Sequence, residues 1–290
     1  MPELPEVETA RLRLEKALKG KVIREADADA SDRFLFLGTD AQEFRRLLEG
    51  AKVKATGRKG KYFWLELDRK PWPVFHLGMT GDVEIRHLGK GVHRPGWGGL
   101  KLWSERGRDQ APPAGVPFFT RVHLRANNGT EVAITDPRKF GRVFFAENPL
   151  LHPRLKKLGF DPLQDFPAAK KLALLLRKRK APIKAVLLDQ KLFAGVGNYL
   201  ADEFLFQAKI SPHRIAAKLS AAEVARLRAK IISVIKKAVA VEADYEFFPK
   251  GWLFHHRWGK NVNARTHTKQ KIVHEEIGGR TTAWVPSVQK

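Results

Sequence analysis

The chain has 290 residues, 43% of them hydrophobic, so it is long enough for two domains with apolar cores and is not a disordered tail. Its 54 lysines and arginines outnumber 31 acidic residues, and the formal net charge of +23 favours a polyanionic partner, either nucleic acid or an anionic membrane surface. No apolar run approaches the roughly twenty residues of a membrane span, no signal peptide is expected at the N-terminus, and the absence of cysteine excludes disulfides and thiolate metal sites.

The first part of the chain predicts two helices and then a series of strands. Apolar residues from Val7 to Leu18 recur at helical spacing, and a strand is expected around Val22. Asp40 and Glu43 form a capping-box pattern in front of a second, shorter helix. After this helix the hydrophobic period changes to two, which is typical of strands in a sandwich or barrel. The expected strands are 52–56, 61–67, 73–78, 82–87, 121–126, 131–135 and 142–146.

Two connections within this strand region have their own composition. Residues 127–129, Asn-Asn-Gly, predict a tight hairpin turn. Residues 89–119 contain Gly, Pro and Trp without a clear period, and we expect them to form an exposed loop.

The sequence changes character after Glu147. Three prolines and one glycine punctuate 148–166, which we expect to be a hinge. Short strand-like pieces return from Pro249. Between them, helices are expected within 168–180, 182–189, 198–208 and from Ser220 to about Val241. The fold class is therefore α+β. Its expected parts are a β domain over 1–147, the hinge over 148–166, a helical domain over 167–248 and a compact module over 249–290.

The opening residues, MPELPEVETA, have two interpretations. Proline and glutamate are ordinary residues for a first helical turn, because proline needs no N–H partner there and the helix dipole favours acidic side chains. Alternatively, removal of Met1 behind a small second residue would leave Pro2 with a free amine, which titrates near 8. Such an amine forms Schiff bases, and Glu3 and Glu6 would supply acid and base chemistry.

Six stretches, in order along the chain, resemble the Fpg/Nei family, which comprises the formamidopyrimidine-DNA glycosylases and their endonuclease VIII relatives. They are PELPEVE at the terminus, RKGKYFWLEL (58–67), HLGMTG (76–81), TDPRKFG (135–141), LFAGVGNYLADE (192–203) and GGRTTAWVP (278–286). The resemblance implies an N-terminal β-sandwich with flanking helices, a helical domain with a helix–two-turn–helix element, and a β-hairpin finger. It favours the chemical interpretation of the opening residues.

The resemblance also implies roles for individual residues near the N-terminus. Pro2 would be the nucleophile that attacks C1′ of the damaged nucleotide, and Glu3 the acid and base. Glu6 matches a second carboxylate that supports the site. Lys61 matches a lysine at the tip of a β-turn that reaches a phosphate, and it is favoured over its neighbour Lys59 because KYFWLEL follows it.

Further residues are implied to bind DNA. Met79, Arg138 and Phe140 match the trio that fills the hole left by an extruded base, where apolar wedges and a guanidinium replace lost stacking. Asn198, in GVGN, matches a phosphate ligand and is also expected to cap the helix after it. Residues 177–184, RKRKAPIK, are expected either to contact phosphates or to form a solvated charged face.

The C-terminal module departs from the bacterial pattern, in which four cysteines bind zinc. The four histidines between His255 and His274 have no recognisable ligand spacing, although a zinc site made of histidines alone remains an alternative. The resemblance is therefore to the zincless branch, which implies a nucleus as the compartment, with an organelle or a bacterial cytoplasm as alternatives. Arg280 matches the arginine of the finger. We expect packing of Trp252, Phe254, Trp258 and Trp284 to hold the module without metal.

The function implied is a bifunctional DNA glycosylase and AP lyase of base excision repair. It would act without cofactor, as a monomer, on double-stranded damaged DNA, and would nick the strand by β,δ-elimination through a Pro2 Schiff base. Residues 241–252 lack the glycine- and threonine-rich capping loop of bacterial 8-oxoguanine enzymes. We therefore expect formamidopyrimidines and hydantoins to be better substrates than 8-oxoguanine. A non-catalytic binder of damaged DNA and a structural protein of chromatin or RNA are the alternatives.

Overall fold

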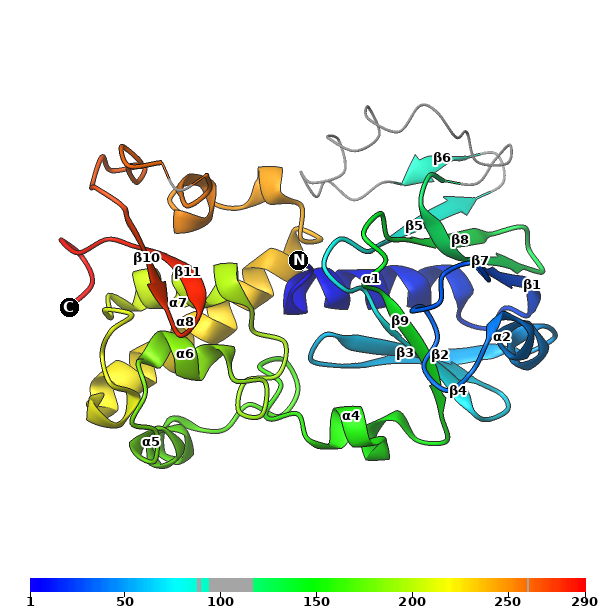
Figure 1. Ribbon diagram of the computed structural model, residues 1–290, viewed down its shortest axis with the longest axis horizontal. Helices are drawn as coiled ribbons and strands as arrows, with labels where there is room; N and C mark the ends of the chain where they lie inside the picture. The colour runs from blue at the N-terminus through cyan, green and yellow to red at the C-terminus, as the bar shows by residue number, and fades with distance from the viewer. Residues whose placement is uncertain (88–89, 94–116, 260) are drawn as a thin grey trace. The chain divides into compact units, whose positions relative to one another are not determined.

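The computed structural model describes residues 1–87, 90–93, 117–259 and 261–290 (Figure 1). The chain divides into two compact units. Unit 1 consists of Met1–Lys156 together with Glu242–Glu246, and unit 2 consists of Lys157–Val241 together with Phe247–Lys290. The short segment 242–246 lies inside the predicted helical domain, yet it belongs to unit 1. The finer division into hinge, helical domain and finger stays a prediction.

Unit 1 contains two antiparallel sheets. The strand order of the first is β1 (Ile23–Ala28), β7 (Thr120–Ala126), β8 (Glu131–Thr135), β5 (Asp82–His87) and β6 (Lys90–His93). The order of the second is β2 (Val53–Lys59), β3 (Tyr62–Leu67), β4 (Trp72–His76) and β9 (Arg142–Ala146). These confirm the seven period-two segments and the strand expected after Val22. The Asn-Asn-Gly turn joins β7 to β8, as predicted.

Strand β6 corrects one prediction. It lies inside 89–119, which we expected to be a loop, and it pairs with β5 at the edge of the first sheet. A four-residue strand at the edge of a sheet does not require alternating apolar and polar residues. Its sequence therefore gives no period-two signal from which it could be predicted. Of the rest of the expected loop, residues 89 and 94–116 lie outside the described residues, and 117–119 lie within them.

Helix α1 (Leu4–Leu18) packs against both sheets of unit 1 (Figure 1). One buried cluster includes Val7 and Leu14 of the helix, Phe63 and Phe75 of one sheet, and Val122 of the other. Helix α2 (Ala41–Leu48) begins at the predicted cap, where the Asp40 carboxylate accepts the Glu43 N–H. Short helical turns η1 (Pro149–Leu151) and α4 (Pro153–Lys156) end the unit's main segment. Because α1 touches both sheets, its N-terminal turn is held rigidly.

Unit 2 contains the predicted helices and the predicted C-terminal hairpin. The helices are α5 (Ala169–Arg177), α6 (Ile183–Leu188), α7 (Asn198–Ala208) and α8 (Ala221–Ala240), with short turns η2 (Ala216–Lys218), η3 (Tyr245–Phe247, in part in unit 1) and η4 (Leu253–His256). Strands β10 (Val273–Ile277) and β11 (Arg280–Trp284) pair antiparallel. Helix α8 buries a stripe at helical spacing, and α7 contacts α6, α8 and β11. The α+β fold class is confirmed.

Candidate active site and nucleic-acid interface

The N-terminal turn of α1 contains two buried carboxylates. Glu3 is 2% exposed and Glu6 is 0% exposed, and a Glu6 carboxylate oxygen accepts the Glu3 backbone N–H at 2.8 Å. Pro2 is also buried. Negative charge is tolerated at this end of a helix because the unpaired N–H groups and the helix dipole are positive there. Glu3 and Glu6 therefore cap the N-terminus of α1 and also place two acidic side chains next to the end of the chain.

The terminal amine lies among the predicted catalytic residues. Burial lowers the pKa of this Met1 amine below its usual value of 8.0, and the charges of Glu3 and Glu6 oppose that shift. The positive charges of Lys61 and Arg138 lower the same pKa further. These four residues come from three separate sequence motifs. A partly desolvated amine with carboxylates and cations beside it is a chemically activated group.

The hairpin between β2 and β3 presents Lys61. Its turn is Gly60–Lys61, and Arg58 donates from Nη1 to the Gly60 carbonyl at 3.0 Å. Arg58 is 2% exposed and also donates from Nε to the carboxylate of Glu8 on α1 at 2.6 Å. This ion pair ties the turn to the helix that carries Glu3 and Glu6. Lys59, the alternative, lies in β2 itself.

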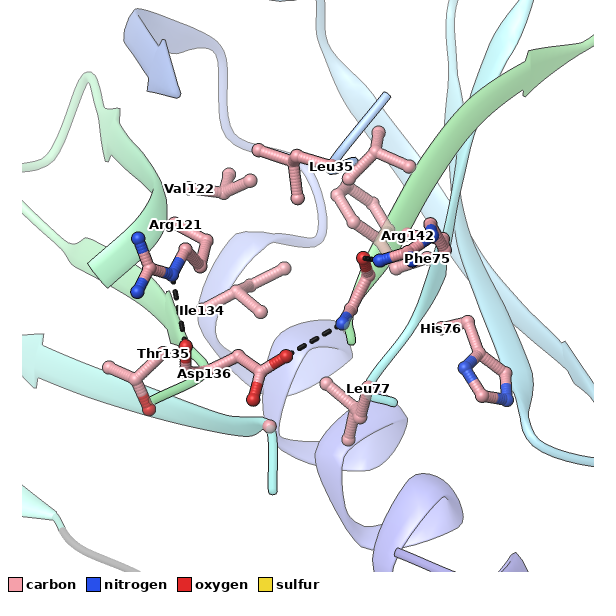
Figure 2. Close-up of a pocket in the computed structure, with 13 residues that line it drawn as sticks. Leu35, Phe75, His76, Leu77, Arg121, Val122, Ile134, Thr135, Asp136 and Arg142 are labelled. Atoms are coloured by element: carbon pink, nitrogen blue, oxygen red, sulfur yellow. Dashed lines mark hydrogen bonds between the residues drawn. The ribbon is translucent and has the colours of Figure 1, made fainter. Parts of the chain in front are cut away.

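A buried aspartate, Asp136, holds two loops of unit 1 together. Its carboxylate accepts the Thr80 hydroxyl at 2.6 Å, the Gly141 N–H at 2.6 Å and the Arg138 N–H at 3.2 Å. Arg121 donates from Nε to the Asp136 carbonyl at 2.9 Å, and Figure 2 shows this bond and the one from Gly141. Asp136 thereby fixes 136–141 against 76–81. Asp136 was not among the predicted site residues, although it stands in the TDPRKFG motif.

The two loops bring Met79, Arg138 and Phe140 together at the surface. Met79 is 37% exposed and Phe140 44% exposed, and the Arg138 guanidinium lies 5.0 Å from the Phe140 ring centroid. Gly78 makes the contact possible, because a Cβ there would lie 2.5 Å from the carbonyl carbon of Phe140. Exposed apolar side chains with a stacked guanidinium form a surface suited to insertion between bases.

A small pocket lies behind these loops, lined by strand residues from both sheets (Figure 2). His76 is one of its lining residues, and burial lowers the pKa of His76 to about 4, with further lowering by Lys61 and Arg142. The His76 ring accepts the Gly78 N–H at Nδ1, 3.1 Å away. A neutral imidazole thus supports the turn that carries Met79. His76 is the first residue of the HLGMTG motif, and this position was the sequence signal from which its supporting role could have been inferred.

In unit 2, Asn198 and Arg280 lie at one junction. Asn198 Nδ2 donates to the carbonyl of Thr281, the residue after Arg280, at 2.8 Å. Arg280 is exposed at the start of β11, next to the Gly278–Gly279 turn. The predicted capping role of Asn198 is wrong: Gly197 occupies the N-cap position, and Asn198 is the first helical residue. Its side chain reaches the hairpin instead of its own helix.

A buried ion cluster, which the sequence analysis missed, fastens the hairpin to the helices. Lys184 and Asp202 are each 0% exposed and form a hydrogen-bonded ion pair. Lys184 also donates to the Asn198 carbonyl at 2.9 Å, while Asp202 accepts from Arg257 Nη2 at 2.7 Å and from the Ala283 N–H at 3.1 Å. Residues 177–184 were expected either to contact phosphates or to form a solvated charged face. Lys184 fits neither expectation, because its side chain is buried in this cluster.

The finger has an apolar core of its own. Leu253, Ile272, Ala283 and Val285 form it. Trp252 and Phe254 are buried as expected, whereas Trp258 is 53% exposed and contributes mainly a ring contact with Phe254 and a stacked Arg257. Trp284 packs edge-on against His213.

The histidines of this region make local contacts. His255 and His274 each lie at hydrogen-bond distance, through Nε2, from a backbone carbonyl. Within the described part of the chain, no group of three or more His, Cys, Asp or Glu is arranged to hold a metal ion. No helix among the described residues is long and apolar enough to cross a membrane.

Known proteins match the chain across both units. Residues 1–143 match the family model of the formamidopyrimidine-DNA glycosylase N-terminal domain, and 158–247 match the model of the formamidopyrimidine-DNA glycosylase H2TH domain. The formamidopyrimidine-DNA glycosylase of Arabidopsis thaliana is 38% identical over 290 residues, covering 100% of this chain and 71% of that protein. The one from Brucella ovis is 35% identical, with 100% of both chains covered.

Solved structures of Fpg from Lactococcus lactis are similar to this chain over nearly its whole length. The crystal structure of Lactococcus lactis Fpg in complex with DNA containing an abasic site has a TM-score of 0.76, 26% identity and 99% coverage of both chains. The complex of the wild-type Lactococcus enzyme with DNA containing N7-benzyl-Fapy-dG has a TM-score of 0.76, 26% identity and 100% coverage of both. With its fold and both domain models matched, this chain belongs to the formamidopyrimidine-DNA glycosylase family of DNA-repair enzymes.

Proposed function

We propose that this protein is a bifunctional DNA glycosylase and AP lyase that removes oxidised bases from duplex DNA and cuts the strand by β,δ-elimination. The observation that carries the proposal is the setting of the terminal amine. Burial lowers the pKa of the Met1 amine, the buried carboxylates of Glu3 and Glu6 beside it oppose that shift, and the cations Lys61 and Arg138 lower the pKa further. A lowered pKa increases the fraction of the amine that is unprotonated and nucleophilic, and carboxylates nearby can transfer protons.

The reactive amine would be that of Pro2 after Met1 is removed. Its nitrogen bonds to C1′ of the damaged nucleotide as the bond from C1′ to the base breaks. The proton that the Pro2 nitrogen loses after bonding to C1′ goes to the departing base, and Glu3 donates a proton to the sugar ring oxygen so that the ring opens. The product is an iminium, whose positive charge withdraws electrons and permits elimination of the 3′ and then the 5′ phosphate. Glu6 acts by holding the first helical turn through the Glu3 N–H.

Base removal from duplex DNA requires the nucleotide to leave the stack. We assign Met79, Arg138 and Phe140 to the space that it leaves. The assignment is supported by their exposure and by the contact between the two loops that carry them. Flipping a nucleotide out of the duplex costs a few kcal/mol. Contacts from these three side chains would replace part of the lost base stacking and so offset part of that cost.

Backbone phosphates would be bound by Lys61 near the lesion, and by Asn198 and Arg280 in unit 2. The helix dipole at the start of α7 favours an anion there, and Asn198 is tied to the residue next to Arg280. With a net charge of +23, affinity should fall steeply as salt rises, because counterions are released from each neutralised phosphate. Binding as a monomer suffices for all these contacts.

We further propose that the finger belongs to the zincless branch of the family and that the protein acts in the nucleus. The absence of cysteine supports the first part. The apolar core of the finger and its buried Lys184–Asp202–Arg257 cluster do the fastening that zinc does in other branches. The compartment rests on the zincless resemblance alone.

A preference among lesions follows from the segment after α8. It lacks glycine- and threonine-rich composition, so we propose weak excision of 8-oxoguanine and faster excision of hydantoins and formamidopyrimidines. Matched single-turnover rates on duplexes that differ only in the lesion test this preference. Equal rates on 8-oxoguanine and a hydantoin would contradict it.

Borohydride trapping tests the function itself. Incubation of the protein with a lesion-containing duplex and borohydride should give a covalent adduct at the N-terminal peptide, detected by gel and mass spectrometry. Pro2→Gly should lose most of the adduct but retain DNA binding. If the wild-type protein binds damaged duplex without any adduct or nick, it is a non-catalytic binder. If it does not distinguish lesion from intact duplex, a structural role is favoured.

A further inference from the structure

The segment Glu242–Glu246 leaves the end of α8 and packs on unit 1. Its first two residues, Glu242 and Ala243, both have φ of 53°, a left-handed conformation that is rare for residues with a side chain. Ala243 is nevertheless 0% exposed. A backbone held in this conformation must be stabilised by its surroundings, so this segment is fastened to unit 1 by specific contacts.

Two contacts fasten it to α1. Arg13 of the helix donates from Nε at 3.2 Å and from Nη2 at 2.8 Å to the same carboxylate oxygen of Glu242. Tyr245 packs against the buried cluster to which Val7 and Ala10 belong. The segment thus lies along the helix whose first turn contains Glu3 and Glu6.

The Tyr245 hydroxyl is hydrogen-bonded to the Glu6 side chain. Burial raises the pKa of Tyr245 well above 10.0, and the charges of Glu6, Glu3 and Asp82 add to the effect. The hydroxyl therefore stays protonated and is the donor. Glu6, buried completely, then accepts from Tyr245 and from the Glu3 N–H.

We propose that Tyr245 is a positioning residue of the active site, whose hydroxyl fixes the Glu6 carboxylate and, through it, the turn that carries Glu3 and the reactive amine. The proposal rests on the proposed function and deepens it. Removing a hydrogen bond to a buried carboxylate costs free energy, because the carboxylate stays buried and no longer has that donor to replace water. In this role Tyr245 acts through its hydrogen bond to Glu6.

Several charged groups surround this contact. Glu6 faces it from the first turn of α1, Glu3 from the N-cap of that helix and Asp82 from β5. The terminal amine interacts with Glu3 and Glu6 and with the cations Lys61 and Arg138. Burial raises the pKa of Asp82 to about 8, while the Val83 N–H and Arg13 oppose the shift. Asp82 therefore adds little negative charge below neutral pH.

Tyr245→Phe tests the proposal, because it removes the hydroxyl and keeps the ring. The single-turnover rate of base excision should fall about tenfold near pH 6 and less at pH 8. The sign follows from the lost donor: a carboxylate that loses a hydrogen-bond donor is protonated more easily, so the acidic limb of the rate profile should move to higher pH. Affinity for duplex containing a non-cleavable abasic analogue should stay within about twofold, because the proposed role of Tyr245 is to hold Glu6 and not to bind DNA.

Two further variants separate positioning from packing. Phe247→Leu changes an exposed neighbour, 67% accessible, and should leave the rate profile unchanged. Tyr245→Leu removes ring and hydroxyl together. If Tyr245→Phe matches the wild type at every pH while only Tyr245→Leu fails, the ring acts by packing and the proposal is overturned. A wild-type protein without trapped adduct would instead refute the proposed function, so the two failures are distinguishable.

Discussion

The guanidinium of Arg138 lies over the ring of Phe140, with 5.0 Å between the guanidinium carbon and the ring centroid. Both residues stand on the loop that Asp136 ties to the Met79 turn. The pair therefore presents a flat, partly cationic surface from a rigid base.

Phe140→Ala should slow excision from duplex DNA by about 10-fold to 100-fold, because a stacking contact worth about 1–3 kcal/mol is lost from the flipped state. Cleavage at a pre-formed abasic site should suffer less, since no base must be unstacked there. Phe34→Ala is the matched control: Phe34 is 66% exposed and has Arg142 over its ring, but it lies outside the trio. Equal losses in both variants would contradict the void-filling role.

Gly78→Ala should destabilise unit 1 and abolish efficient excision. The new Cβ would lie 2.5 Å from the backbone of Phe140, and the residue has φ of +64°. We expect a loss of about 2 kcal/mol or more in the free energy of unfolding, from strain and overlap together. Gly20→Ala is the control: Gly20 has φ of +79°, but a Cβ added there would meet no atom within 4 Å. This variant therefore measures the cost of backbone strain without steric overlap. Urea unfolding of both variants measures the difference, and equal losses would show that the close approach is unimportant.

Lys184→Met should cost about 3 kcal/mol of stability, because it leaves the buried Asp202 with Arg257 as its remaining cationic partner in the cluster. Lys180→Met, at an exposed position in the same basic stretch, should change stability little. Unfolding followed by the fluorescence of the tryptophans of unit 2 reports on the right region. A Lys184 variant as stable as the wild type would show that this cluster does not hold the finger.

Acidification should weaken the fold through His76. The pKa of His76 is about 4 in the folded protein and 6.5 as its ordinary value, so the unfolded chain binds the proton more tightly. The contribution of neutral His76 is complete above pH 6.5 and is lost progressively as pH falls from 6.5 to about 4. Comparing the free energy of unfolding of the wild type and His76→Gln across this range measures it. Parallel pH dependences for the two proteins would exclude His76 as the cause.

The sequence by itself determined the helices, most of the strands and the list of candidate residues. Periodicity and turn chemistry are local properties, so the strand at 62–67 and the cap at Asp40 could be predicted from a few neighbours. The motif residues Lys61, Met79, Arg138 and Phe140 could be named because the stretches that contain them resemble the Fpg/Nei family. Strand β6 could not, because an edge strand is defined by its pairing with β5.

Only the tertiary structure decided how these residues act on one another. Arg13 and Glu242 are paired although they lie at opposite ends of the chain, and Lys184 is buried because Asp202 and Arg257 approach it. Asn198 reaches Thr281 and not its own helix end. In each case the partner is distant in sequence, and no local pattern encodes its direction. Burial then sets the pKa values and the strengths of these contacts, because desolvation depends on everything that packs around a group.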